Sequence, residues 1–134
     1  MVIPGSAHSI EILNNKIHDG SWGGNNAPCG QVRCYTYPIY HSGSTSLFEG
    51  NELYNFPSWG IHVYAGSPDH NVFRNNIIHD FGWGDNRSSG ILIYVGNGNQ
   101  VYDNLIYNGS QGIAAGSGAT TTQIHNNNVY NMLK

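Results

Sequence analysis

The stretch IEILNNKIHD (residues 10–19) has four further copies in the chain that align with it without gaps. They are SLFEGNELYN (46–55), NVFRNNIIHD (71–80), QVYDNLIYN (100–108, one residue shorter at its start) and TQIHNNNVYN (122–131). All five follow the pattern apolar-x-x-Asn-x-aliphatic-[His/Tyr]-[Asp/Asn]. A repeat of this kind is typical of a solenoid, in which each unit buries its apolar residues only by stacking on its neighbours.

Three columns of this alignment carry the structural prediction. One is Asn in every copy: Asn15, Asn51, Asn76, Asn104 and Asn127. The first apolar column holds Ile12, Phe48, Phe73, Val101 and Ile124, and the second holds Ile17, Leu53, Ile78, Ile106 and Val129. We expect the apolar columns to form the core. We expect the Asn column to lie at a sharp bend, because Asn accepts the left-handed conformation and its amide can bond the Asn of the next unit and nearby backbone groups.

A second strand pattern follows most copies, at Gly60-Ile61-His62-Val63, Gly90-Ile91-Leu92-Ile93 and Gly112-Ile113-Ala114-Ala115. Each unit then has three short strands, which cannot bury a face as independent hairpins but can pair with their equivalents in the next unit, about 4.8 Å away. The sequence therefore predicts an all-β fold, a right-handed single-stranded parallel β-helix of about five coils without evident end caps. The Leu spacing of leucine-rich repeats and the six-residue period of left-handed solenoids are both absent. We treat residues 1–134 as a single domain.

The composition supports β structure and excludes several classes of protein. The 134 residues include 18 Gly and 18 Asn, which tolerate backbone conformations that helices avoid. A hydrophobic share of 39% and a net charge of −3 argue against disorder. Five Lys and Arg against eight Asp and Glu leave no basic stripe for nucleic acid. Because no long apolar run is present either, we expect neither a nucleic-acid partner nor a membrane span.

The repeat units followed by Gly-Ile strands resemble the right-handed parallel β-helix repeat proteins, over about residues 2 to 131. That group includes pectate and alginate lyases, mannuronan epimerases and many secreted proteins. The resemblance implies an active cleft on the outer face of the Gly-Ile sheet and an extracellular or cell-surface location. We therefore expect a module that binds or modifies an acidic or plant-type polysaccharide, in a lyase-like or epimerase-like reaction if it is an enzyme. The motifs of the polygalacturonase-like hydrolases are absent.

Candidate catalytic residues lie on and beside the Gly-Ile strands. Alternation along the strands places His62, Tyr64 and Tyr94 on one outer face. With Asp85 and Arg87 of the neighbouring insertion, they would supply a base, a phenol proton donor and a cation for β-elimination from a uronate. Each also has a structural interpretation, as a solvated His, stacked Tyr rings or an Asp-Arg pair.

Three tryptophans follow the repeat Asn by seven or eight positions in consecutive copies: Trp22, Trp59 and Trp83. This spacing predicts indole rings that stack along one edge. They would form either a platform for sugar rings or an aromatic stack that seals the turn.

Metal and disulfide chemistry is only weakly indicated. Cys29 and Cys34 enclose four residues in an insertion, so they are either a disulfide or a reduced pair. Zinc would have to recruit histidines, and calcium would depend on Asp19, Asp80 or Asp85, with no acidic cluster on one face. We expect no metal and no cofactor.

Two dipeptides that look catalytic, His18-Asp19 and His79-Asp80, fall in repeat columns that hold Tyr and Asn in the other copies. The sequence therefore predicts structural roles for both pairs.

Finally, no amphipathic helix is available to cover the ends of the stack, so the chain is expected to be a fragment of a longer solenoid or a unit that associates end to end. The alternative function is therefore a non-catalytic structural or assembly solenoid.

Overall fold

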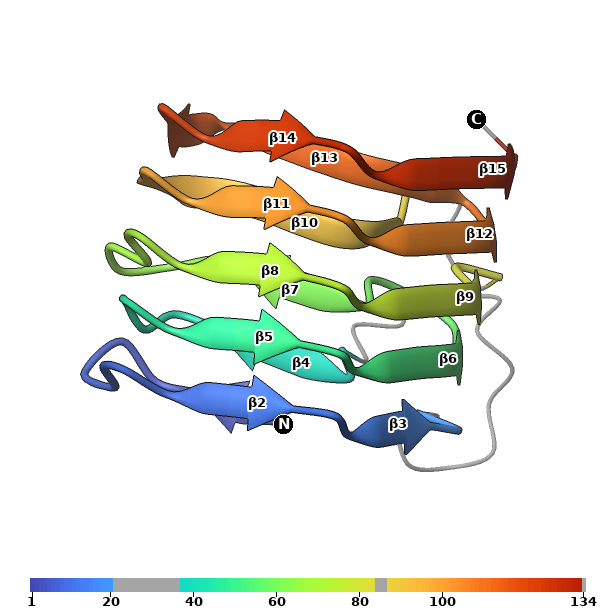
Figure 1. Cartoon of the computed structure of the whole chain (residues 1–134), viewed down its shortest axis with the longest axis horizontal. Helices are drawn as coiled ribbons and strands as arrows, with labels where there is room; N and C mark the ends of the chain where they lie inside the picture. Colours follow the sequence, from blue (N-terminus) through green and yellow to red (C-terminus); the bar gives the residue numbers. More distant parts are fainter. Residues whose placement is uncertain (21–36, 84–86, 134) are drawn as a thin grey trace.

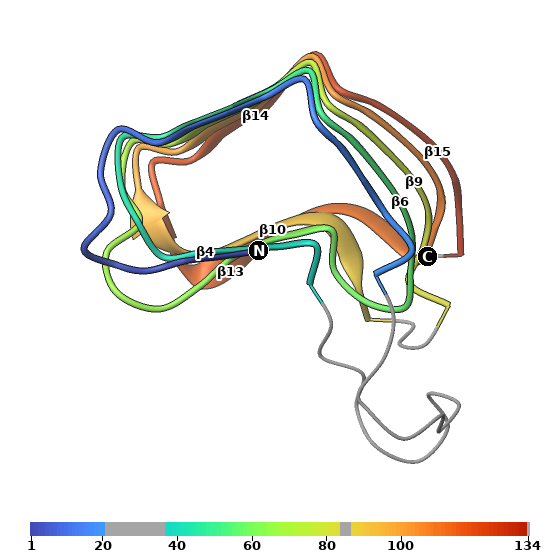
Figure 2. The same cartoon turned by 90° about the horizontal axis from the view of Figure 1, so that it is seen from below.

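The computed structural model describes residues 1–20, 37–83 and 87–133, and these residues form fifteen β-strands. The strands pair in parallel in three five-stranded sheets, and each sheet takes one strand from every coil (Figures 1 and 2). The predicted parallel solenoid with three strands per coil is therefore confirmed. The described residues include no helix long and apolar enough to cross a membrane.

Most strands contain three to five residues. The first sheet consists of β1 (Val2–Ile3), β4 (Ile39–His41), β7 (Ile61–Val63), β10 (Ser89–Asn97) and β13 (Gln111–Thr120). The second sheet consists of β2 (Glu11–Leu13), β5 (Leu47–Glu49), β8 (Val72–Arg74), β11 (Gln100–Tyr102) and β14 (Gln123–His125). The third sheet consists of β3 (Lys16–His18), β6 (Glu52–Phe56), β9 (Ile77–Phe81), β12 (Leu105–Gly109) and β15 (Asn128–Met132).

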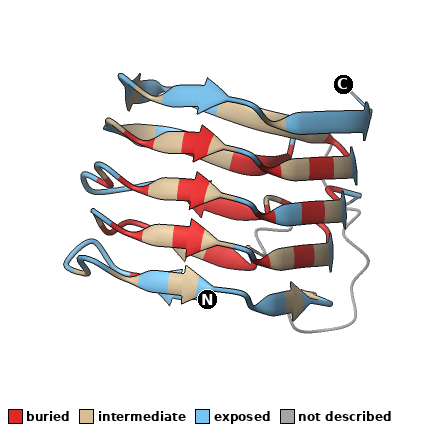
Figure 3. Cartoon of the chain, viewed as in Figure 1, coloured by how far each residue is buried: buried red, intermediate tan, exposed pale blue. Residues whose placement is uncertain are grey.

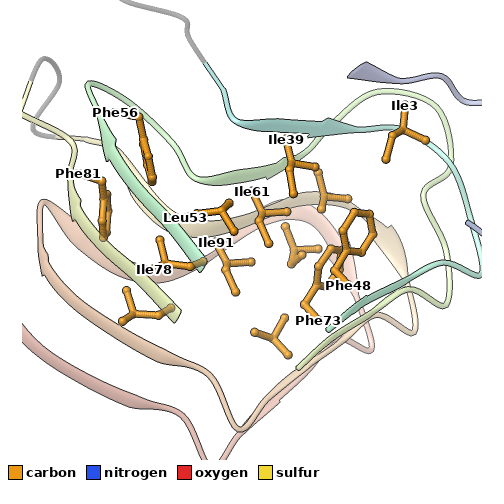
Figure 4. Close-up of a cluster of buried hydrophobic side chains, with 14 residues drawn as sticks. Ile3, Ile39, Phe48, Leu53, Phe56, Ile61, Phe73, Ile78, Phe81 and Ile91 are labelled. Carbon is orange, nitrogen blue, oxygen red and sulfur yellow. The ribbon is translucent and has the colours of Figure 1, made fainter. Parts of the chain in front are cut away.

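The two predicted apolar columns fill the interior, joined by inward residues of the first sheet. Because equivalent strands are in register, like side chains stack on like. The rings of Phe48 and Phe73 lie 4.8 Å apart and nearly parallel, and those of Phe56 and Phe81 lie 5.4 Å apart (Figure 4). The inward apolar side chains are buried in the middle coils, and burial falls at both ends of the stack, where a coil has only one described neighbour (Figure 3).

Three columns of left-handed residues recur at bends in all five coils. One column lies immediately before the repeat Asn of each copy and comprises Asn14, Gly50, Asn75, Asp103 and Asn126. The others comprise Asp19, Asn55, Asp80, Asn108 and Asn131, and Ser9, Thr45, His70, Gly98 and Thr121. The expectation that the repeat Asn itself is left-handed was wrong by one residue. Its side chain is used to bond the next coil, while the preceding residue makes the bend.

The amides of the repeat Asn residues form the predicted ladder. Nδ2 of Asn51 donates to Oδ1 of Asn76 at 3.0 Å, and Nδ2 of Asn76 donates to Oδ1 of Asn104 at 2.9 Å. Asn15 and Asn127 continue the ladder on either side through the same bond. From the second coil on, each Oδ1 also accepts the backbone N–H of the Asn in the preceding coil, as Asn76 does from Asn51 at 3.0 Å. The ladder therefore satisfies buried polar groups at a bend that would otherwise be costly to bury.

A second, shorter ladder was not predicted. Asn71 Nδ2 donates to Asn99 Oδ1 at 3.1 Å, and both side chains are fully buried before strands of the second sheet. On the other side, Asn71 Oδ1 lies 3.1 Å from Nε2 of His41, a histidine buried inside the coil. The sequence shows only two Asn residues in this column, which is too few to stand out as a repeat.

The strand β4 was also missed. Its sequence Pro38-Ile39-Tyr40-His41 lacks the Gly that marks the equivalent strands, but Ile39 pairs with Ile61 in register. The pairing shows that tertiary stacking, and not the glycine, defines this strand.

Candidate functional site

The outer face of the first sheet carries the aromatic residues that the strand alternation predicted. The register of β4, β7 and β10 aligns Tyr40 with His62 and His62 with Leu92. Tyr64 follows β7, and Tyr94 lies within β10 in the next coil. Their rings lie 4.9 Å apart, and each tyrosine is 41% exposed.

Six rings join into one continuous patch, which we call the aromatic surface: Tyr37, Tyr40, Trp59, His62, Tyr64 and Tyr94. His62 lies at its centre, with its ring centroid between 4.7 and 5.5 Å from those of Tyr37, Tyr40, Trp59 and Tyr64. Trp59 packs almost parallel to the imidazole, at an interplanar angle of 24°. The patch therefore extends over neighbouring coils along the axis of the solenoid.

The environment of His62 determines its chemistry. Its side chain is only 8% exposed, and burial lowers its pKa from 6.5 to about 4. The imidazole is therefore uncharged at neutral pH, and its Nδ1 has no hydrogen-bond partner among the described residues. A general base works best when its pKa lies near the working pH. His62 is thus better suited to packing among aromatic rings than to abstracting a proton.

The other predicted site residues are distributed differently. Arg87 is exposed two residues before β10. Trp83 is exposed at the end of the third sheet, where it lines a hollow that shares no lining residue with the aromatic surface. Trp59 is not among the residues that line this hollow.

Four predicted residues, Trp22, Cys29, Cys34 and Asp85, lie outside the residues that the structure describes.

Tyr37 and Tyr40 belong to the aromatic surface but were not predicted. The alignment of Ile39 with Ile61 would have placed Tyr40 beside His62, but the missing Gly in that copy hid the correspondence. Tyr37 precedes the strand and falls opposite Trp59 in the same register, so it was missed for the same reason.

The family model described as right handed beta helix region matches residues 2–129 of the chain. The chain belongs to this family. Searches of the curated proteins and of the solved structures gave no significant match. The family match accounts for the β-helix but not for a relation to lyases or epimerases in particular.

In this β-helix the two His-Asp dipeptides have the repeat roles that the sequence predicted. A stack of five rings runs along the outer face of the third sheet: His18, Tyr54, His79, Tyr107 and Tyr130. Successive ring centroids lie 4.8 to 5.2 Å apart, with interplanar angles of 3° to 9°. Beside it, Nδ1 of His79 donates to Asp80 at 2.8 Å, and Asn108 Nδ2 donates to the same carboxylate at 3.0 Å. These two hydrogen bonds lower the pKa of Asp80 below its usual value.

Potential metal ligands are dispersed over the described part of the β-helix. Within residues 1–20, 37–83 and 87–133, no group of three or more His, Cys, Asp or Glu side chains is arranged to hold a metal ion. Asp19 and Asp80 each accept hydrogen bonds from a neighbouring His and from an Asn of the next coil. The described carboxylates thus act mainly within the side-chain columns of the repeat.

Proposed function

We propose that this β-helix binds a polysaccharide across the aromatic surface. The observation that carries the proposal is the continuous patch of six rings, in which Tyr64 and Tyr94 are each 41% exposed. Sugar rings present apolar C–H faces that pack on aromatic rings, while their hydroxyl groups bond polar neighbours. Because the patch crosses coils that are about 4.8 Å apart, it suits a chain of sugar rings better than a single small molecule.

An acidic glycan is the polysaccharide class that we propose. Arg87 is exposed two residues before β10, the strand that carries Tyr94, and is a positively charged side chain near the start of that strand. His62 contributes no charge at neutral pH because its pKa is about 4. A uronate carboxylate near Arg87 would therefore meet a favourable charge.

We propose binding in place of catalysis at this surface. The residue best placed to act as a base, His62, is largely covered by neighbouring rings and has a pKa well below neutral. Such an imidazole accepts a proton poorly at pH 7, whereas β-elimination requires a base that can remove the proton beside the uronate carboxylate. The lyase-like reaction expected from the sequence therefore has less physical support than binding.

The binding proposal can be tested by affinity measurements with polygalacturonate and alginate oligosaccharides, using variants Tyr64→Ala and Tyr130→Ala. These tyrosines are similarly exposed, at 41% and 44%, but Tyr130 belongs to the stack on the third sheet. We expect Tyr64→Ala to weaken binding by about tenfold, equivalent to about 1.4 kcal/mol, and Tyr130→Ala to leave it unchanged. Trp59→Ala should act in the same direction as Tyr64→Ala.

Equal effects of the two tyrosine variants would contradict binding at the aromatic surface. Appearance of the absorbance of unsaturated uronates during incubation with the parent chain, and its loss in His62→Ala, would show that the surface is catalytic. Absence of binding to any glycan would instead favour the alternative below.

The alternative is a structural or assembly role, which the continuous ladders and the five-ring stack favour as rigid elements. On this alternative, copies of the chain associate end to end and pair the strand edges that the outermost coils leave unpaired. Ile124 and Val129 of the last coil, 44% and 41% exposed, would then become buried. Sedimentation that depends on protein concentration is the expected result, and a sedimentation coefficient that is constant over all concentrations would contradict it.

A further inference from the structure

A concave feature lies at the ends of the third-sheet strands. It is a hollow of about 340 Å³, lined in part by Trp83 and Leu133 and by a row of polar side chains. Trp83 is 55% exposed, so much of its indole is available to a ligand. Gly109 also borders the hollow and contributes no side chain to fill it.

The polar row consists of the left-handed bend residues of four successive coils: Asn55, Asp80, Asn108 and Asn131. Neighbouring members are bonded through Asn108 Nδ2 to Asp80 Oδ1 at 3.0 Å and Asn131 Nδ2 to Asn108 Oδ1 at 3.2 Å. Asn55 instead donates to Asp19 in the preceding coil. Within the described part of the chain, no hydrogen bond joins Asn55 to Asp80.

This interruption leaves hydrogen-bonding capacity facing the hollow. A carboxylate has about four acceptor sites, and a primary amide has two acceptor sites and two donors. The bonds within the row use only some of these. Side chains in adjacent coils are about 4.8 Å apart, which is close to the separation of alternate hydroxyl groups on a pyranose ring. The row can therefore bond two hydroxyl groups of one sugar while the C–H face of that sugar packs on Trp83.

The charge at the hollow limits the ligand. The hydrogen bonds from His79 and Asn108 keep the pKa of Asp80 low, so its carboxylate is ionised at neutral pH. Among the described lining residues, none is a Lys or Arg that would offset this charge. A second carboxylate in the hollow would be repelled by Asp80, whereas neutral hydroxyl groups would donate hydrogen bonds to it.

We propose that the hollow is a second carbohydrate site, which holds the ring of a neutral sugar against Trp83 and discriminates against uronates through Asp80. This site is separate from the aromatic surface and has the opposite charge preference. Each of the two sites can therefore exist without the other.

The test is an NMR titration of the full chain, following the indole N–H signals, with cellotriose as the neutral probe and trigalacturonate as the acidic one. We expect cellotriose to shift the Trp83 signal and to bind about tenfold more weakly to Trp83→Ala. Tyr102→Ala should cause no change, because Tyr102 stacks on His125 in the second sheet and lines neither site. Trigalacturonate should leave the Trp83 signal in place. A Trp83 signal that does not respond to cellotriose, or an equal loss of affinity in Trp83→Ala and Tyr102→Ala, would overturn the proposal.

The role of Asp80 has a matched control within the same column. Asp19 accepts equivalent bonds from His18 and Asn55 but does not line the hollow. We expect Asp80→Asn to let trigalacturonate shift the Trp83 signal, and Asp19→Asn to leave the preference for the neutral sugar intact. If Asp80→Asn does not alter that preference, or Asp19→Asn alters it equally, charge discrimination by Asp80 is wrong.

Discussion

Replacing Asn76 with Ala should destabilise the solenoid strongly, because this side chain connects three coils. Its Oδ1 accepts the backbone N–H and Nδ2 of Asn51, each at 3.0 Å. Its Nδ2 donates to Asn104 Oδ1 at 2.9 Å and to the Phe48 carbonyl at 3.0 Å. All four bonds are buried and would be lost together.

The size of the destabilisation depends on whether the groups that bonded Asn76 keep another hydrogen-bond partner. Asn51 Nδ2 keeps its bond to the Ile12 carbonyl, and Asn104 Oδ1 keeps the backbone N–H of residue 76. The backbone N–H of Asn51 has no other described hydrogen bond and would be left buried and unsatisfied, at a cost of about 1–3 kcal/mol. Together with the other lost bonds and the void, we expect the free energy of unfolding to fall by about 3–5 kcal/mol.

Asn15→Ala is the matched control. Asn15 lies in the same column but is exposed, and its Nδ2 donates to Leu13 O and Asn51 Oδ1 without any described donor to its own Oδ1. We expect a loss below about 1 kcal/mol. Urea unfolding followed by circular dichroism measures both variants, and hydrogen exchange of the Asn51 amide measures the local effect. Similar losses in the two variants, or unchanged exchange at Asn51, would refute the reasoning.

Three further results are expected. The pKa of His62 falls from 6.5 to about 4 on folding, so the unfolded chain binds more protons between these pH values. The contribution of His62 to stability is therefore complete above pH 6.5 and decreases by up to about 3 kcal/mol as the pH falls to 4. In His62→Gln the midpoint of urea unfolding should vary less with pH over that range. The same pH dependence in the variant and the parent chain would exclude this linkage. Phe73→Ala should cost about 3–5 kcal/mol in urea unfolding, because Phe73 is fully buried and stacks on Phe48; a loss below about 1 kcal/mol would argue against a tightly packed column. Gly109→Ala should destabilise the protein by about 1–3 kcal/mol, because a Cβ there overlaps the Phe81 ring. In a double-mutant cycle, Phe81→Leu should reduce this penalty, and strictly additive effects would contradict the contact.

Features that repeat with the coil could be predicted from the sequence because parallel, in-register pairing places each side chain on its counterpart. The columns of Phe48 and Phe73 and the ladder through Asn76 are examples. The stacking of His79 between Tyr54 and Tyr107 follows from the same register, which is why His79-Asp80 could be recognised as a repeat position.

Backbone angles, and features that few coils share, could not be read from the repeat. The left-handed residue at each bend was misplaced by one position, because the alignment gives columns but not backbone angles. The second ladder through Asn71 and Asn99 was missed because too few copies carry Asn there.

The sequence by itself determined the solenoid, its stacked core and its principal amide ladder, since these depend only on the identity of residues that recur in every coil. Only the tertiary structure decided which non-repeating side chains meet: Tyr37 and Tyr40 around a buried His62, and Trp83 beside Asp80. The physical reason is that periodic contacts are fixed by the register of neighbouring strands, whereas these contacts depend on the path of irregular turns and on packing between residues far apart in the sequence.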